Sequence, residues 1–290
     1  MRILIASVHY WDPQGGGQHQ SLRPQPEPRL KALTAQLQAL RRLHQSQSLL
    51  DIGQRLVLPA NQALRHQIDV RLITDGEHTV LEWLDPPYRQ WAQEVVTRPA
   101  NGRLLGFEAQ RFLADQLDQD YDFYAYFEDD LIIHDPLFFH KIAWFQGLLG
   151  SAALLLPQRV ELHDGPHAVD RFYIDGPIAE ADLRQLIAEP APTVIAQLPC
   201  GEAVFDSPAN PHAGCFVLSA EQLRAWVAHP CWQNGDCSFV SPLESAATLG
   251  IATVFQLYKP AFSHAAWLEV QHWGTSFHQL IGPPHSGDNA

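Results

Sequence analysis

Three consecutive carboxylates, Glu128, Asp129 and Asp130, directly follow the aromatic segment 122–127. That segment reads Asp-Phe-Tyr-Ala-Tyr-Phe and predicts a buried β-strand, because aromatic residues favour strands and little charge interrupts them. Adjacent carboxylates repel one another, so a simple polar turn gives no reason to place three of them together. A divalent cation does, because Mg²⁺ and Mn²⁺ prefer oxygen ligands and leave positions for water and substrate phosphates. The pattern predicts a metal–diphosphate site at a strand end.

A solvated acidic turn is the alternative interpretation of these three residues. The chain becomes apolar again at once, with Leu131, Ile132 and Ile133. A solvated turn rarely lies between two apolar runs, so the sequence favours the metal site. His134-Asp135-Pro136 then predicts the start of a helix.

The second half of the chain holds further candidate residues. His212 and Gly214 lie in a small-residue turn before a predicted strand, where glycine lets the backbone approach a ligand closely. Glu244 falls in the first turn of a predicted helix, which favours a carboxylate electrostatically and suits a general base. An ordinary helix-stabilising glutamate is the alternative. His264 and His272 follow near the end, and either imidazole could complete a metal shell, although a single histidine is more often structural.

Strands and helices are expected to alternate along the chain. The predicted strands are 2–8, 67–74, 122–127, 152–156, 171–174, 213–218 and 251–257, with a possible short strand at 57–58. Helices are predicted at 29–44, 104–117 and 136–149 and after the capping residues Ser219 and Ser241, with a surface connection at 188–199. This order predicts an α/β fold with a mixed, mostly parallel central sheet flanked by helices. We expect one domain, 1–280, and a disordered tail, 281–290.

The charge and hydropathy of the chain exclude several classes of function. A formal net charge of −13 argues against binding to nucleic acid or an anionic membrane surface, which requires clustered Lys and Arg. No apolar run reaches the ~20 residues of a membrane span. The first strand lacks a cleavage site of the signal-peptide type, so we expect a cytoplasmic protein.

The four cysteines, Cys200, Cys215, Cys231 and Cys237, contain no CxxC pair. We therefore expect scattered reduced thiols and no structural zinc. A thiol–imidazole site formed by His229, Cys231 and Cys237 is the alternative.

Taken in order, these motifs resemble the GT-A nucleotide-sugar glycosyltransferases, within the nucleotide-diphospho-sugar transferase superfamily. Glu128-Asp129-Asp130 matches the DxD-type motif of that family in a Glu-Asp-Asp form, and the resemblance spans about residues 1–274. It implies a Rossmann-like GT-A fold and a hexosyltransferase that uses Mn²⁺ or Mg²⁺ to hold the diphosphate of a nucleotide-sugar donor.

The resemblance also implies a role for each candidate residue. The acid triplet, His212 and Gly214 would contact the donor, and Asp129, Asp130 and His264 or His272 would bind the metal. Glu244 would deprotonate the acceptor, an unidentified glycan or small molecule, if the enzyme inverts. Glu244 lacks the adjacent acid that the family often has.

Two other classes of function stay open at this point. A nucleotidyltransferase or a phosphohydrolase also uses strand-end acids with a metal ion. A carbohydrate-binding protein on a degenerate transferase fold would explain the eight Trp residues, although the intact acid cluster argues against it.

Overall fold

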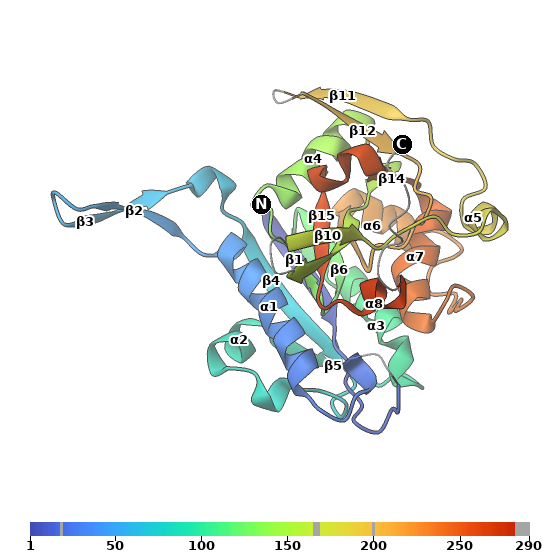
Figure 1. Cartoon of the computed structure of the whole chain (residues 1–290), viewed down its shortest axis with the longest axis horizontal. Helices are drawn as coiled ribbons and strands as arrows, with labels where there is room; N and C mark the ends of the chain where they lie inside the picture. The colour runs from blue at the N-terminus through green and yellow to red at the C-terminus, as the bar shows by residue number, and fades with distance from the viewer. Residues whose placement is uncertain (18–19, 165–168, 199–200, 282–290) are drawn as a thin grey trace.

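The computed structural model describes residues 1–17, 20–164, 169–198 and 201–281, and the predicted tail lies outside these ranges from residue 282 onward. Its central sheet has five strands in the order β13-β6-β1-β4-β5 (Figure 1). These strands are β1 (Arg2–Val8), β4 (Gln67–Thr74), β5 (Gln93–Val96), β6 (Phe123–Glu128) and β13 (Cys215–Ser219). Neighbours pair in parallel except β13, which runs antiparallel to β6. The predicted mixed, mostly parallel α/β sheet flanked by helices is confirmed.

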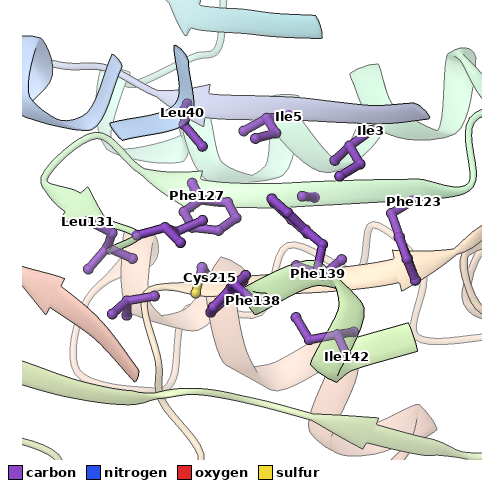
Figure 2. Packing of buried hydrophobic residues seen from close by; sticks show 14 of the residues in the cluster. Ile3, Ile5, Leu40, Phe123, Phe127, Leu131, Phe138, Phe139, Ile142 and Cys215 are labelled. Atoms are coloured by element: carbon purple, nitrogen blue, oxygen red, sulfur yellow. The ribbon is translucent and has the colours of Figure 1, made fainter. Parts of the chain in front are cut away.

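Helices cover both faces of this sheet, which explains why β1 and β6 are continuous apolar runs. Ile3 and Ile5 of β1 pack toward α1 (Glu27–His44) and α4 (Phe138–Leu149), as Figure 2 shows for part of this cluster. Leu4 and Ala6, which alternate with them, pack toward α3 (Leu105–Asp115), α6 (Ala220–Val227) and α7 (Pro242–Val254). Successive strand residues point to opposite faces, so each face receives its own core.

Two smaller sheets border the central one. One has the order β10-β9-β15-β7 and the other the order β11-β12-β14-β8. Their strands are β7 (Leu131–Ile132), β9 (Gln158–Asp164), β10 (Val169–Tyr173), β15 (Glu269–His272), β8 (Ala153–Leu155), β11 (Val194–Leu198), β12 (Gly201–Asp206) and β14 (Gln256–Pro260). Three short helices complete the fold: α2 (Pro86–Trp91), α5 (Glu180–Leu186) and α8 (Ser276–Ile281).

Two predicted elements are wrong. Residues 251–254 of the expected strand 251–257 are the end of α7, and only its last two residues belong to a strand, β14, which begins at Gln256. Its apolar run suits a buried helix as well as a strand, and periodicity alone does not separate them. The expected surface connection 188–199 contains β11, which begins after Pro190 and Pro192 and pairs with β12.

A two-stranded hairpin projects away from the body of the molecule (Figure 1). Its strands are β2 (Gln47–Asp51) and β3 (Leu56–Ala60). Both faces are exposed: the adjacent residues Leu49 and Leu50, which point to opposite faces, keep 57% and 65% of their surface in solvent. Only residues 57–58 of this hairpin were anticipated as strand.

No helix in the described ranges is long and apolar enough to cross a membrane. Cys215, Cys231 and Cys237 are free thiols, and Cys200 lies outside the described residues. Of the alternative thiol–imidazole site, His229 and Cys231 do meet, with 3.0 Å between Nδ1 and Sγ.

Candidate active site

The acid triplet lies where the winding of the central sheet reverses. After β1 the chain crosses to β4 on one side, whereas β6 lies on the other side of β1. In open α/β sheets, ligands bind outside the carboxyl ends of the strands at such a point. The strand register pairs Val8 with Glu128, so the acids begin directly beside the end of β1.

Asp129 faces the protein interior. It is fully buried, and its two carboxylate oxygens contact His9 Nδ1 and Arg29 Nη2. His9 Nε2 accepts a hydrogen bond from the Val80 amide at 3.0 Å, so its proton resides on Nδ1 and is donated to Asp129. Burial, followed by the charge of Arg29, lowers the pKa of His9 to about 3 and keeps the ring neutral. Asp129 thus anchors two elements to the end of β6.

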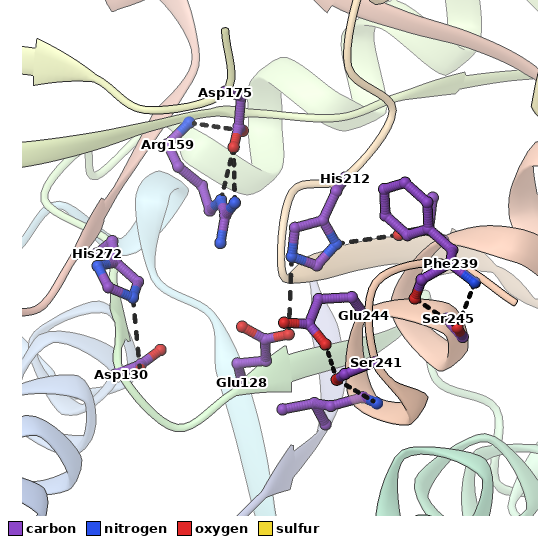
Figure 3. Close-up of polar contacts among 12 residues, drawn as sticks. Glu128, Asp130, Arg159, Asp175, His212, Phe239, Ser241, Glu244, Ser245 and His272 are labelled. Atoms are coloured by element: carbon purple, nitrogen blue, oxygen red, sulfur yellow. Dashed lines mark hydrogen bonds and ion pairs between the residues drawn. The ribbon is translucent and has the colours of Figure 1, made fainter. Parts of the chain in front are cut away.

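Asp130 lies between a fixed cation and a late histidine. Arg29 Nη1 donates to Asp130 Oδ2 at 2.9 Å, and His272 Nε2 lies 3.8 Å from the same oxygen (Figure 3). Pairing of His272 with Leu131 across β15 and β7 brings the histidine to this position. Burial disfavours its charged form, but the carboxylates of Asp130 and Glu161 outweigh burial and raise the pKa of His272.

Glu128 is a buried carboxylate at the centre of the site. Its Oε1 lies 3.9 Å from Nε2 of His212 and has no hydrogen-bond partner among the described residues. Burial, and then the charge of Asp130, raise the pKa of Glu128 to about 7. His212 is held by Thr248, 2.9 Å from Nδ1, and burial lowers its pKa well below the ordinary value, so it is neutral.

Gly214 contacts this carboxylate. Its φ is +63°, and a Cβ there would lie 2.8 Å from Glu128 Oε2. The close approach expected of this glycine is therefore made to a side chain of the site.

A buried ion cluster opposite the acids was not found from the sequence. Arg159 donates through Nε and Nη2 to Asp175 Oδ1, at 2.9 and 2.7 Å, and Lys259 Nζ donates to Asp175 Oδ2 at 2.7 Å. Figure 3 shows the Arg159 guanidinium pointing toward Glu128. Burial would lower the pKa of Arg159, but Asp175 and then Glu128 and Asp130 raise it. Arg159 and Asp175 each follow a predicted strand closely, which was the available signal.

Glu244 lies beside this cluster, on the wall of a cleft. The cleft measures about 330 Å³ and covers the end of β1, and its lining includes Val8, Tyr10, Arg29, Arg103 and Glu244. The Glu244 carboxylate also accepts a hydrogen bond from Ser241, the N-cap of α7, so it contributes to the helix start. Its charge helps raise the pKa of Glu128, after burial and Asp130.

His264 lies in a different part of the fold. It belongs to the short 3₁₀ helix Phe262–Trp267, which packs against β12 and β14. Its Nδ1 bonds the hydroxyl of Ser263 at 2.9 Å. Of the two late histidines, His272 is the one that meets the acids.

The arrangement of the carboxylates and imidazoles decides whether the site can hold a metal ion. Within the described ranges, no group of three or more His, Cys, Asp or Glu side chains is arranged to hold one. Asp129 has no carboxylate oxygen without a protein contact. Asp130 Oδ2 and His272 Nε2 lie 3.8 Å apart, and the same Asp130 oxygen accepts the hydrogen bond from Arg29.

Comparisons with known proteins give remote similarities of fold. No protein-family model and no curated protein matches the chain. One similar structure is mannose-1-phosphate geranyltransferase from Thermus thermophilus, with 12% identity, a TM-score of 0.41, and coverage of 89% of this chain and 73% of that one. Another is CMP:2-keto-3-deoxy-manno-octonic acid synthetase complexed with CTP, with 12% identity, a TM-score of 0.31, and coverage of 93% and 89%. Similarities this remote assign no activity, so function has to be argued from the site.

Proposed function

We propose that this chain is a glycosyltransferase that moves a sugar from a nucleotide-diphosphate donor to an acceptor hydroxyl. The observation that carries the proposal is the meeting of buried carboxylates and buried cations at the reversal point of the sheet, beside an open cleft. Glu128 at the end of β6, Asp130 in the turn after it and His272 at the end of β15 converge there with Arg159. Buried charged groups cost free energy, so a cluster of them beside a cleft favours a functional role over a purely structural one.

The cleft at the end of β1 suits the phosphates of the donor. Arg29 and Arg103 line it, and a guanidinium can donate two parallel hydrogen bonds to phosphate oxygens. Arg29 is fixed in place by Asp129 and Asp130, so it would bind phosphate without losing much side-chain freedom. A cleft of about 330 Å³ lies within the size range of small-molecule sites.

Asp130 and His272 are the residues that would hold a divalent cation, Mn²⁺ or Mg²⁺. Two protein ligands are enough, because Mg²⁺ is commonly bound by one or two carboxylates together with substrate phosphates. A divalent ion held there would supply positive charge against the departing diphosphate. Asp129 is left out of this shell because it is fully buried between His9 and Arg29, which contact both its oxygens, and His264 because it lies against β12 and β14. A metal ion at Asp130 Oδ2 would compete with the hydrogen bond from Arg29.

Glu244 is the proposed general base for the acceptor hydroxyl. It lies on the cleft wall in the first turn of α7, where the helix N-terminus favours negative charge. Its side chain accepts the Ser241 hydroxyl, which would hold the carboxylate in one orientation. A positioned base accepts the proton as the acceptor oxygen attacks the sugar carbon.

The test is a thermal-shift screen of nucleotide-diphosphate sugars with and without Mn²⁺, repeated on Asp130→Asn. A ligand that binds only the folded state raises its melting temperature, so the donor should stand out with Mn²⁺ and lose its effect in Asp130→Asn. Asp118→Asn, an exposed aspartate outside the site, is the control for the same chemical change. Identical Mn²⁺-dependent shifts in wild type and Asp130→Asn would refute the metal assignment.

Product analysis then separates the possible reactions of the site. Glycosyl transfer releases a nucleoside diphosphate, because the bond between the sugar and the diphosphate breaks. Hydrolysis within the diphosphate releases a nucleoside monophosphate and a sugar phosphate instead. Pyrophosphate release from a nucleoside triphosphate and a sugar phosphate would identify a nucleotidyltransferase. Binding without turnover would favour the carbohydrate-binding alternative.

A further inference from the structure

A second cleft, of about 500 Å³, adjoins the first. It lies between α5, the loop 231–240 and the C-terminal half of α7. Ser238, Phe239 and Val240 line this second cleft, whereas Ser241 and Glu244 line the 330 Å³ cleft. The segment 238–244 is therefore a wall shared by the two clefts, and the proposed base stands at its end.

The shared wall is held firmly and reaches the acid cluster. Ser245 Oγ accepts a hydrogen bond from the Phe239 amide at 3.1 Å and donates one to the Phe239 carbonyl at 2.7 Å (Figure 3). The Phe239 ring lies 6.2 Å from the His212 ring, and His212 approaches Glu128. A ligand in the second cleft would thus contact Phe239, the residue that packs against His212 of the charged site.

The loop that forms the rim is strained. Val240 has a φ of 49° and Gln233 a φ of 53°, a conformation that is a genuine outlier for a β-branched residue such as valine. Val240 also keeps 81% of its surface exposed, so burial of its own side chain does little to offset the free-energy cost of this conformation. Strain of this kind persists where the surroundings impose it, and it is concentrated at ligand-binding segments.

The lining of the second cleft selects against anions. Its polar side chains are mainly carboxylates, amides and hydroxyls. Among the described residues, no Lys or Arg belongs to this lining. Asp182 and Asp236 would repel a phosphate, whereas carboxylates and amides accept and donate hydrogen bonds to hydroxyl groups. The aromatic ring of Phe239 offers a flat apolar surface for the carbon face of a sugar ring, and Leu249 adds aliphatic surface.

We propose that this cleft binds the acceptor of the transfer reaction, and that the acceptor is an uncharged, polyhydroxylated compound such as a glycan. The proposal rests on the proposed function, because only a transfer reaction uses an acceptor. It requires the acceptor to reach from this cleft past the segment 238–244 to Glu244 in the first cleft. It assigns the donor to the arginine-lined cleft and the acceptor to the acid-lined one.

Saturation-transfer NMR with neutral methyl glycosides of glucose, galactose and mannose tests the assignment, with glucose 6-phosphate as the anionic counterpart. Thr253→Trp places a bulky ring in the cleft from an exposed position of α7 and should weaken glycoside binding by about tenfold or more. Gln38→Trp, on the exposed side of α1, is the matched control and should bind as wild type does. Glucose 6-phosphate should bind wild type more weakly than the neutral glycosides.

The possible results distinguish a wrong acceptor assignment from a wrong donor function. The thermal shift with nucleotide sugars and Mn²⁺ should be unchanged in Thr253→Trp, because that residue does not line the donor cleft. Glycoside binding that Thr253→Trp abolishes, in a protein that binds no nucleotide sugar, would uphold the cleft and refute the donor function. Failure of wild type to bind any neutral glycoside, equal binding by Thr253→Trp, or preference for glucose 6-phosphate would overturn the acceptor assignment.

Discussion

Gly214→Ala is expected to destabilise the protein and to disturb the site at the same time. Gly214 has a φ of +63°, a conformation that costs an L-residue with a Cβ about 1–2 kcal/mol. The new Cβ would also lie 2.8 Å from Glu128 Oε2 and 3.0 Å from Leu131 Cδ1. Both neighbours are buried, so relieving these contacts requires a shift in a packed region, which typically costs a further ~1–3 kcal/mol.

The matched control is Gly235→Ala. Gly235 has a φ of +69°, close to that of Gly214, but a Cβ there would meet no atom within 4 Å. This variant therefore carries the backbone cost alone, about 1–2 kcal/mol. The difference between the two variants isolates the contact of residue 214 with Glu128 and Leu131.

Urea unfolding of wild type and both variants measures this difference, provided that the three m-values agree. We expect Gly214→Ala to lose about 1–3 kcal/mol more than Gly235→Ala. It should also weaken nucleotide-sugar binding, because Glu128 has to move. If the two variants agree within about 0.5 kcal/mol, the close packing of Gly214 on the carboxylate is not real.

Three further predictions concern the late histidines, the base and the buried ions. His272→Ala should raise the Mn²⁺ concentration needed for donor binding about tenfold or more, whereas His264→Ala should not; equal titration curves would remove His272 from the metal. Glu244→Gln should lower kcat by about 10²–10⁴ with donor affinity nearly unchanged, and a change confined to acceptor KM, or a product of retained configuration, would argue against a base. Asp175→Asn should cost about 3–5 kcal/mol at pH 7, because it leaves Arg159 and Lys259 buried without their carboxylate. Burial opposes ionisation of Asp175, but those two cations hold the pKa of its carboxyl well below the ordinary 3.8. The contribution of the ionised Asp175 to the free energy of unfolding is therefore complete above pH 3.8 and declines as the pH falls below it. The stability gap between wild type and Asp175→Asn, measured by urea unfolding, should therefore narrow as the pH falls below 3.8, and a constant gap would contradict the assignment.

The elements of the central sheet could be predicted because local sequence determines them. Strand β6 is an unbroken apolar run, and α1 shows one apolar face repeating with the helical period, so both could be located without tertiary information. The acids at the end of β6 follow from the same reading. The prediction of a strand at 251–257 was wrong because the spacing of its apolar residues fits a buried helix as well as a strand.

The composition of the site could be predicted only in part. The cluster of Arg159, Asp175 and Lys259 joins strand ends that are far apart in the sequence, and no local pattern records their meeting. The sequence also does not predict that the side chains of Asp129 and Asp130 contact different partners. Adjacent residues of one motif differ because the turn after β6 directs Asp129 to His9 and Arg29, and leaves Asp130 within reach of His272.

The projecting hairpin β2–β3 is expected to unfold locally at a lower free energy than the central sheet. Its two strands form a sheet of their own, and their large side chains contribute little burial. An isolated two-stranded hairpin is marginally stable in water, so the amides of 47–60 open locally, at a small fraction of the free energy that opens the central sheet. Hydrogen exchange and limited proteolysis would therefore start at the hairpin tip while the ends of β1 and β6 stay closed. Local disorder in this arm is compatible with an intact site.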